Sequence, residues 1–356
     1  MPRKQWSLLI IAVTLLVVGA IAVAQRNQPS QSGQVTSQPN KAGTETTKPT
    51  TSSSPTAKLA VPTQAATKPQ KPAPTTTATP AGTSSHPIRA MFYYPWFPQT
   101  WGLESGTAFT NFHPTAGYYS SDDRSIVDQH IKAMRYARMD VAVSSWWGQN
   151  QQNEQSRLPM QLTAAEGTGL TWALYYEKEG FGDPSVSEIR SDLAYINQRY
   201  VSSSTFAQIN KKPVIFVYGD DKDDCGMAAR WGQANQALGN QFHIILKVFN
   251  GFRGCAQQPG GWHQYSPAVA TDTNAGLYYA IGAGFWKKGE SPVLNRDPKR
   301  WVANVKSMVA SKAPLQLVAT FNEWGEGTAL ESATEWSSPS GYGTYLDALH
   351  DNIPAN

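Results

Sequence analysis

The sequence is poor in charged residues and in the motifs that bind metals or nucleotides. Only 16% of its 356 residues are charged, the net charge is +4, and several lysines lie in an N-terminal tail, which argues against a nucleic-acid surface. The six histidines include no HxxxH or HxH pair and the two cysteines no CxxC motif, so a zinc site is not indicated. Neither a glycine-rich phosphate loop nor a Gly-x-Ser-x-Gly motif is present, which weakens nucleotide-binding and serine-hydrolase readings.

Aromatic residues, by contrast, are plentiful. The chain has 12 Trp and 15 Tyr, and hydrophobic residues make up 40% of it. Few charges and many aromatic rings suit a protein that binds sugars by stacking on their apolar faces. An aromatic-rich core would give the same composition, so composition alone does not decide between them.

The two cysteines, Cys225 and Cys255, follow the fourth and fifth predicted strands. In an oxidising compartment they could pair, and neighbouring loops of a barrel can come within disulfide reach. We predict a bridge that braces these loops; the alternative is two unrelated buried thiols.

Residues 1–25 predict a membrane segment. Arg3 and Lys4 precede a run from Leu8 to Ala24 that is apolar except for Thr14, at the lower edge of the length that spans a bilayer. The basic flank predicts a single-pass protein of the cell membrane. Its N-terminus stays in the cytoplasm, and the globular domain lies on the extracytoplasmic side. Ala22-Val23-Ala24 also reads as a cleavage site, so a removed signal peptide and a secreted protein form the rival reading.

Residues 26–86 predict a disordered linker. They are rich in Thr, Pro, Ser, Gln, Ala and Lys, contain no Phe, Tyr or Trp, and include one acid, Glu45. Such a segment cannot bury enough apolar surface to offset its chain entropy. It resembles a cell-wall spacer extended by its prolines, and its Thr-Pro clusters could carry O-glycans.

Residues 87–356 alternate strand and helix patterns. Helices are expected after Asp122–Asp123, which are good caps, over Val186–Tyr200, and around Arg300–Ser311. Eight alternating strands over about 270 residues predict an α/β fold of the (β/α)8 barrel type, with a doubly wound sheet as runner-up. The expected strands are Ile88–Tyr94, Val141–Ser145, Trp172–Tyr176, Val214–Tyr218, Phe242–Val248, Tyr265–Ala270, Leu277–Ile281 and Leu315–Thr320.

The chemistry of such barrels lies at the carboxyl ends of the strands, so the residues there are the candidate site. They combine aromatic rings for stacking with carboxyl and amide groups for hydrogen bonds to hydroxyls, although many of the aromatics could simply cap the barrel. The candidate substrate-binding residues are Tyr93, Tyr94, Trp96, Trp146, Trp147, Tyr176, Glu177, Asn250, Tyr279, Asn322 and Trp324.

Glu323 and Glu326 are the candidate catalytic residues. Glycoside cleavage typically needs two carboxyl groups in different protonation states. In a continuous strand two residues three apart face opposite ways, but Gly325 and Gly327 allow a turn that could aim both acids at the barrel mouth. Crowding two acids there raises one pKa and keeps that group protonated near neutrality.

The segment Phe321-Asn-Glu-Trp-Gly-Glu-Gly-Thr-Ala-Leu-Glu331 resembles the signature of glycoside hydrolase family 99, the endo-α-mannosidase-like family. Similar likenesses span roughly residues 87–350. They include Tyr93-Tyr94-Pro95-Trp96, Tyr175-Tyr176-Glu177 and Gly284-Phe285-Trp286.

The resemblance implies a (β/α)8 barrel and retaining cleavage of α-mannosidic linkages through a 1,2-anhydro sugar, without a metal or organic cofactor. Glu323 matches the base that deprotonates the sugar 2-hydroxyl, and Glu326 matches the general acid and base. Where the family's endo-mannosidases have a His, this chain has Gly325, which puts mannan specificity in question. The expected partners are a polysaccharide or glycan substrate and the membrane, with the protein a monomer.

Two further readings remain open. The barrel could be a non-catalytic carbohydrate-binding or cell-wall scaffold protein, although the intact acid pair argues against it. It could also be another surface hydrolase, such as a deacetylase or a peptidase. His113 and His263 fall in predicted loops and could contact sugar, but lone histidines are more often structural.

Overall fold

The computed structural model describes residues 87–103 and 106–355. The predicted membrane segment and linker, residues 1–25 and 26–86, lie outside the described residues. Within the described ranges, no helix is both long and apolar enough to cross a membrane.

A row of parallel strands forms the centre of the domain. Their order is β7-β6-β5-β3-β2-β1-β10-β9, and each is parallel to its neighbours. Two short strands, β8 and β4, add antiparallel to β9 and β5. The strands are β1 (Ile88–Tyr93), β2 (Val141–Trp146), β3 (Thr171–Tyr176), β4 (Gln208–Ile209), β5 (Lys212–Val217), β6 (His243–Lys247), β7 (Gly261–His263), β8 (Thr271–Asn274), β9 (Tyr278–Gly282) and β10 (Leu315–Ala319).

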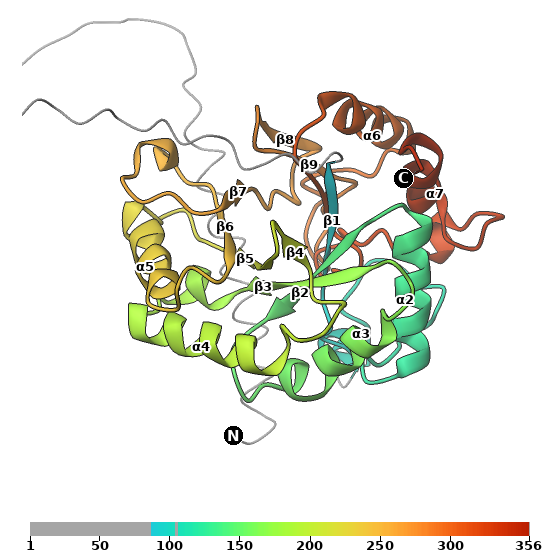
Figure 1. Ribbon diagram of the computed structural model, residues 1–356. Coiled ribbons are helices and arrows are strands. Elements are labelled where there is room, and N and C mark those ends of the chain that lie inside the picture. Colours follow the sequence, from blue (N-terminus) through green and yellow to red (C-terminus); the bar gives the residue numbers. More distant parts are fainter. Residues whose placement is uncertain (1–86, 104–105, 356) are drawn as a thin grey trace, which may run out of the picture. The chain divides into compact units, whose positions relative to one another are not determined.

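The helices lie outside this curved sheet (Figure 1). Asp123 caps the first of them by accepting a hydrogen bond from the Ser125 N–H, as expected from the sequence. The fold is therefore α/β and barrel-like, although β7 and β9 share no backbone pairing among the described residues. The helices are α2 (Arg124–Tyr136), α3 (Leu158–Ala164), α4 (Val186–Arg199), α5 (Cys225–Gln236), α6 (Pro298–Ser311) and α7 (Thr344–Asn352).

One expected strand was misplaced. Tyr265–Ala270 is loop, and the strand that follows β6 is the short β7, immediately before it. Ser266-Pro267 lies in that stretch, and a proline has no N–H to donate to a strand ladder. The other seven expected strands coincide with β1, β2, β3, β5, β6, β9 and β10 to within two residues.

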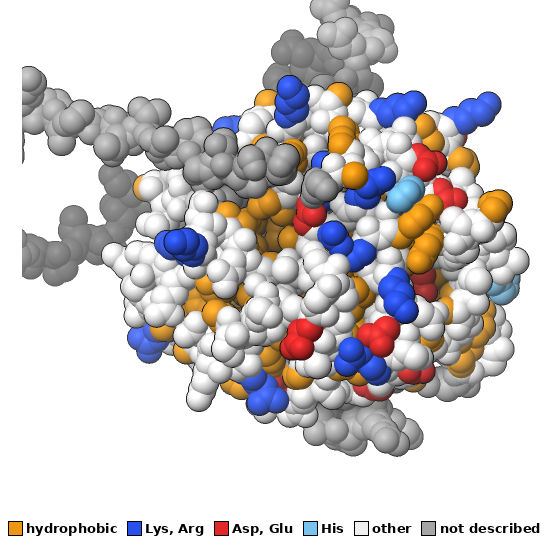
Figure 2. Space-filling view, turned by 45° about the vertical axis from the view of Figure 1, so that its right-hand side comes forward, with side chains coloured by type: hydrophobic (Ala, Val, Ile, Leu, Met, Phe, Trp, Pro, Cys, Tyr) orange, Lys and Arg blue, Asp and Glu red, His pale blue; other side chains and the backbone are white. Residues whose placement is uncertain are grey.

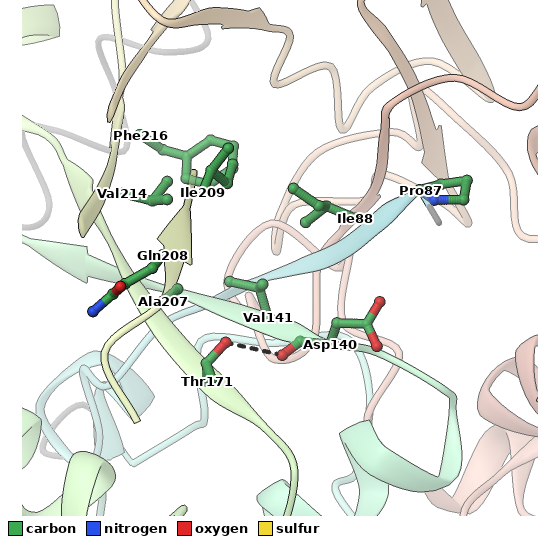
Figure 3. Close-up of a pocket in the computed structure, with 10 residues that line it drawn as sticks. All are labelled: Pro87, Ile88, Asp140, Val141, Thr171, Ala207, Gln208, Ile209, Val214 and Phe216. Atoms are coloured by element: carbon green, nitrogen blue, oxygen red, sulfur yellow. Dashed lines mark hydrogen bonds between the residues drawn. The ribbon is translucent and has the colours of Figure 1, made fainter. Parts of the chain in front are cut away.

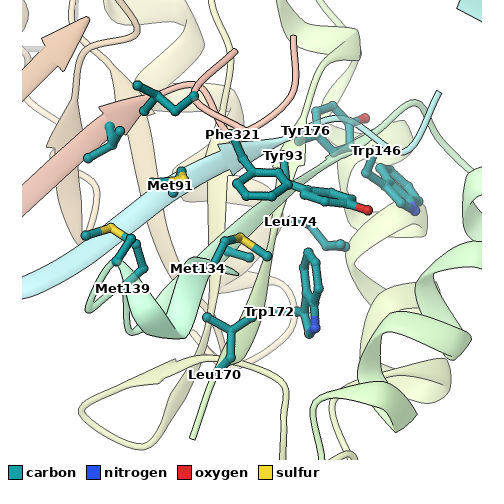
Figure 4. Packing of buried hydrophobic residues seen from close by; sticks show 14 of the residues in the cluster. Met91, Tyr93, Met134, Met139, Trp146, Leu170, Trp172, Leu174, Tyr176 and Phe321 are labelled. Carbon is teal, nitrogen blue, oxygen red and sulfur yellow. The ribbon is translucent and has the colours of Figure 1, made fainter. Parts of the chain in front are cut away.

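Side chains alternate between two buried layers, because successive residues of a strand face opposite sides. Phe92, Tyr94 and Tyr175 belong to the layer inside the curved sheet. Met91, Tyr93 and Tyr176 belong to the layer between sheet and helices, which Figure 4 shows packed around Met134 and Trp172. This alternation decides which aromatic residues can reach the inside of the barrel.

The Cys225–Cys255 disulfide predicted from the sequence is present, with the two Cα atoms 5.3 Å apart. Cys225 is the first residue of α5, and Cys255 directly follows the short helix Phe252–Gly254. The bridge therefore joins the segments that follow β5 and β6, at the carboxyl ends of these strands.

Charged side chains are dispersed over the one face of the molecule that Figure 2 draws. In the face drawn in Figure 2, basic and acidic groups are interspersed and no field of one sign stands out. This arrangement agrees with the small net charge and gives no support for a nucleic-acid surface.

Candidate active site

Three glutamates gather at the carboxyl ends of the parallel strands. Glu177 directly follows β3, and Glu323 and Glu326 follow β10. Their exposed fractions are 5%, 8% and 7%, so all three carboxyl groups are nearly removed from water. Each interacts electrostatically with at least one of the others. The structure thus brings together both predicted catalytic acids and one predicted substrate-binding acid.

A tight turn presents Glu323 and Glu326 on the same side. The Glu323 N–H donates to Thr320 Oγ1 at 3.0 Å, and the Thr328 N–H returns to the Glu323 carbonyl at 3.2 Å. Gly327 has a φ of +65°, and a Cβ there would clash with the Trp286 carbonyl oxygen. Of the two glycines noted in the sequence, Gly327 is therefore the one whose backbone requires glycine.

Gly325 lies between the two acids and is partly exposed. A Cβ at this position would be 3.3 Å from the ring of Phe109 and 3.6 Å from Glu323 Oε1. Phe109 therefore occupies the space beside Gly325 and forms an apolar wall next to Glu323.

Burial and mutual repulsion raise the pKa values of all three acids. Burial, followed by the charges of Glu326 and Glu177, raises the pKa of Glu323 well above its ordinary value. Burial raises the pKa of Glu326 to about 7, and the opposing charge of Lys287 limits the rise. Burial also raises the pKa of Glu177 to about 8, although a hydrogen bond with Ser145 opposes the shift. Near neutral pH, the three carboxyl groups of the unliganded site are therefore not all ionised.

Tyrosines line the space around these acids. Tyr94 and Tyr265 form a side-chain hydrogen bond, and burial together with the nearby glutamates raises both of their pKa values. Tyr175 and Tyr218 continue the lining, with ring centroids 5.8 Å apart. Since their pKa values are also raised, these phenols stay protonated and can donate hydrogen bonds to a ligand.

Two tryptophans meet at one serine on the same side of the sheet. Trp96 and Trp147 donate their indole N–H groups to Ser145 Oγ at 3.2 and 3.1 Å. Both rings are half-buried. The serine that interacts with Glu177 thus also fixes two aromatic faces on which a sugar ring could stack.

Several predicted substrate-binding residues lie elsewhere. Tyr93, Trp146 and Tyr176 face the layer between sheet and helices (Figure 4), where Tyr176 donates to Asp192 at 2.8 Å. Tyr279 packs against the same layer, and Asn250 is exposed. Strand alternation puts only every second side chain inside, which places Tyr93, Trp146, Tyr176 and Tyr279 on the side away from the acids.

Asn322 and Trp324 are fully buried and support the turn rather than line it. Asn322 exchanges two hydrogen bonds with the backbone of Tyr94, at 2.8 and 3.0 Å. Trp324 donates to Glu331 at 3.0 Å, and Glu331 also binds Tyr119 at 2.7 Å and His130 at 3.1 Å. This buried network fixes the residues on both sides of Glu323.

The two histidines that the sequence predicts in loops, His113 and His263, lie in different environments. His113 is exposed and pairs with Glu335 at 2.7 Å on the surface. His263 ends β7 inside the sheet, fully buried against Tyr175, and burial lowers its pKa to about 3. His263 is therefore neutral near pH 7 and can only accept or donate as an uncharged ring.

The sequence reading missed Tyr265, Lys247 and Lys287. Tyr265 is the first residue of the expected strand Tyr265–Ala270, which is loop in the structure, and a lone lysine gives no signal by itself. Lys287 is 4% exposed and lies on the loop whose Trp286 N–H donates to the Glu326 carbonyl at 2.9 Å. In the sequence, only its position next to the Gly284-Phe285-Trp286 stretch indicates that Lys287 could lie near the site.

One group among the described residues has the arrangement of possible metal ligands. Carboxylate oxygens of Glu179, Asp183 and Asp223 lie within 4.8 Å of one another. The guanidinium of Arg230 already contacts Glu179 and Asp183, the latter at 2.9 Å. The positive charge beside these acids is therefore supplied by the side chain of Arg230.

A cavity of about 270 Å³ opens at the other end of the sheet. Its lining comes from the amino ends of β1, β2 and β3 and from β5, with Ile209 and Phe216 on one side and Ile88 on the other (Figure 3). Because the acids lie at the carboxyl ends of these strands, this mainly apolar cavity is separate from the candidate active site.

Comparison with known proteins agrees with this geometry. The model of the family "Glycosyl hydrolase family 99" matches residues 90–241, a range that includes Glu177 but not Glu323 or Glu326. The glycoprotein endo-alpha-1,2-mannosidase of Xenopus laevis is 23% identical over 267 residues, which are 63% of this chain and 58% of that protein. The glycoprotein endo-alpha-1,2-mannosidase-like protein of Mus musculus is 23% identical over 287 residues, 67% of this chain and 61% of that protein.

Solved structures show the same fold. The GH99 endo-alpha-mannosidase from Bacteroides thetaiotaomicron superposes with a TM-score of 0.61 at 21% identity, covering 74% of this chain and 95% of that one. A glycoside hydrolase-like protein gives a TM-score of 0.53 at 14% identity. The chain spans about three fifths of the length of the curated relatives it matches.

The chain has an α/β barrel-like fold with buried acids at the strand ends, and it superposes on a solved structure of a glycoside hydrolase. More narrowly, the family model over residues 90–241, the curated relatives and the superposed structure all show similarity to glycosyl hydrolase family 99.

Proposed function

We propose that the protein is a retaining glycoside hydrolase that cleaves α-mannosidic linkages in a cell-surface or extracellular polysaccharide, with endo-α-mannosidase-like action. The observation that carries the proposal is the turn that buries Glu323 and Glu326 side by side with Glu177 under a lining of tyrosines. The similarity to endo-alpha-mannosidases supports the substrate class.

The proposed reaction has two steps and is balanced in protons. In the first, Glu323 takes the proton of the sugar 2-hydroxyl, the 2-oxygen attacks the anomeric carbon, and the bond to the leaving oxygen breaks as Glu326 protonates it. In the second, Glu326 takes a proton from water, whose oxygen opens the 1,2-anhydro ring, and Glu323 returns its proton to the 2-oxygen. Two inversions at the anomeric carbon give net retention.

In the unliganded site the pKa values of both Glu323 and Glu326 are raised, so neither carboxyl group is yet committed to the role of base. A bound sugar supplies what is missing. A 2-hydroxyl that donates to Glu323 stabilises its ionised form and lowers its pKa. The proton is then retained on Glu326, whose pKa is already about 7 without ligand. Substrate binding thus sets the protonation states that the reaction requires.

A glycan screen with acid-to-amide variants tests the proposal. We expect the wild-type chain to release oligosaccharides from an α-mannan but not from α-glucans. Glu326→Gln should lose most activity on the mannan and keep more on an α-mannosyl fluoride, since a good leaving group needs little proton donation. Glu323→Gln should be poor on both substrates.

Two results would count against the proposal. Full activity in both variants would remove Glu323 and Glu326 from the chemistry. Saccharide binding without turnover of any substrate would favour a non-catalytic carbohydrate-binding protein.

We also propose that residues 8–24 hold the protein in the cell membrane with the domain outside, on the basis of the apolar run and the Arg3–Lys4 flank. Protease added to intact cells should then release the domain by cutting within residues 26–86. A chain that stays intact under these conditions, and is cut only after lysis, would contradict this.

A further inference from the structure

A buried lysine lies inside the barrel at the carboxyl end of β6. Lys247 is the last residue of that strand. Ile245, two residues earlier in the strand, belongs to the layer inside the curved sheet. By strand alternation Lys247 therefore also faces inward. It pairs in register with His263 of β7, which contacts Tyr175. The lysine thus shares the inner side and the strand-end level of the three glutamates.

Its ammonium group has little to bind. Lys247 is 8% exposed, and its Nζ makes no hydrogen bond to any residue that the structure describes. The nearest acidic oxygen, Asp221 Oδ1, is 3.9 Å away, beyond hydrogen-bond distance, on a side chain that is 59% exposed. Burying an ammonium without hydrogen bonds is costly, so this position is suited to an amine that a ligand completes.

One aromatic ring separates this lysine from the acids. Nζ lies 5.6 Å from the ring centroid of Tyr218. Tyr218 in turn interacts electrostatically with Glu177 and Glu326, and its ring centroid is 6.2 Å from that of Tyr265. A saccharide whose one sugar is held at the acids could therefore place the next sugar at Lys247.

The surrounding charges select the kind of group that binds. Burial lowers the pKa of Lys247, and the charges of Asp221, Asp223, Asp220 and Asp272 oppose this. Because these carboxylates make the region around the amine acidic, an anionic substituent would be repelled. A neutral sugar fits better, since an ammonium can donate to one hydroxyl oxygen while a carboxylate accepts from the adjacent hydroxyl.

We propose that Lys247 and Asp221 form a second sugar subsite that binds the vicinal hydroxyls of an uncharged sugar adjacent to the one being cleaved. This subsite rests on the proposed glycosidase function. A protein with this subsite binds at least two linked sugars at the same time.

The test compares a long and a short probe. The full chain carrying Glu326→Gln, a variant expected to lose most of its turnover, is titrated calorimetrically with α-1,2-linked mannotetraose. Adding Lys247→Met or Asp221→Asn should raise the Kd about 10- to 100-fold, the loss expected for a hydrogen bond to a charged group. Lys222→Met, an exposed lysine of the same loop, is the matched control and should leave the Kd unchanged.

The same substitutions are then made in the otherwise wild-type chain. The kcat/KM for the tetraose should fall by a similar factor, whereas kcat/KM for α-mannosyl fluoride, which cannot reach the subsite, should stay within twofold. Asp221 is exposed, so its variant reports on the subsite even if Lys247→Met fails to fold.

The outcomes separate the subsite from the function. A tetraose Kd that neither substitution changes, or no measurable tetraose binding at all, would overturn the subsite. An equal loss on fluoride and tetraose would also overturn it, by placing Lys247 at the acids. If the wild type binds the tetraose through Lys247 but hydrolyses nothing, the subsite stands and the proposed hydrolase function fails.

Discussion

Replacing Glu177 by the neutral, nearly isosteric Gln should make the protein more stable, and increasingly so as the pH rises. Glu177 is 5% exposed, and its Oε1 makes no hydrogen bond to any described residue. Burial and the charge of Glu326 raise its pKa from 4.5 to about 8. The folded state therefore binds this proton more tightly than the unfolded state does, and stability falls as the pH rises from 4.5 to 8.

The size of the effect follows from the linkage. One pKa unit corresponds to about 1.4 kcal/mol. Between pH 4 and pH 7, Glu177 ionises in the unfolded state but stays mostly protonated in the folded state, which lowers the free energy of unfolding by about 3 kcal/mol. By pH 9 the free energy of unfolding is lower by about 5 kcal/mol. Glutamine does not ionise, so the Glu177→Gln variant escapes this loss. The difference in free energy of unfolding between the variant and the wild type should therefore grow by about 3 kcal/mol from pH 4 to pH 7 and by about 5 kcal/mol from pH 4 to pH 9.

Urea unfolding at pH 4, 7 and 9 measures the difference. Glu166→Gln, at an exposed position, is the control and should follow the wild type at every pH. Glu323 and Glu326 remain in all variants, so the difference reports the loss of the Glu177 charge, including its effect on the pKa of Glu323. Wild-type and Glu177→Gln stabilities that change in parallel from pH 4 to 9 would refute the claim that burial raises the pKa of this carboxyl group.

Other predictions concern the parts that support the site. Lys287→Met should raise the pKa of Glu326 above about 7. If Glu326 is the proton donor, the alkaline limb of the pH profile of kcat should then move to higher pH. A shift of the acidic limb to higher pH would instead identify Glu326 as the base. Gly327→Ala should abolish activity and destabilise the fold, because its Cβ meets the Trp286 carbonyl, whereas Gly276→Ala, with a φ of +78° and open space, should cost only about 1–2 kcal/mol; similar effects at both positions would contradict the close approach. Removing the Cys225–Cys255 bridge, which closes a loop with a sequence separation of 30, should cost roughly 3–4 kcal/mol in thermal or denaturant unfolding, and an unchanged midpoint would show that the bridge constrains nothing.

The sequence was sufficient for most of the framework. Apolar runs bounded by loops located seven of the strands, and the Asp123 cap located the start of α2. The turn after β10 was also foreseeable, because Gly327 allows the positive φ that brings Glu323 and Glu326 together. These features depend on local residue types, which a single sequence displays directly.

The details of the site depend on register, which the sequence does not display. In the pairs Tyr93-Tyr94 and Tyr175-Tyr176 only one ring of each can face inward, and the structure selects Tyr94 and Tyr175. Fully buried aromatic strands carry no polar alternation that would have marked the inner face. Lys247 was missed for a related reason, since its burial results from the loops around it.

The most direct test of the central claim is the rate of fluoride release from α-mannosyl fluoride and from its 2-deoxy analogue. If Glu323 and Glu326 work through the sugar 2-hydroxyl, the wild type should release fluoride from the first substrate and not measurably from the second, and Glu323→Gln should be inactive on both. Comparable wild-type rates on the two fluorides, or an active Glu323→Gln, would contradict the account.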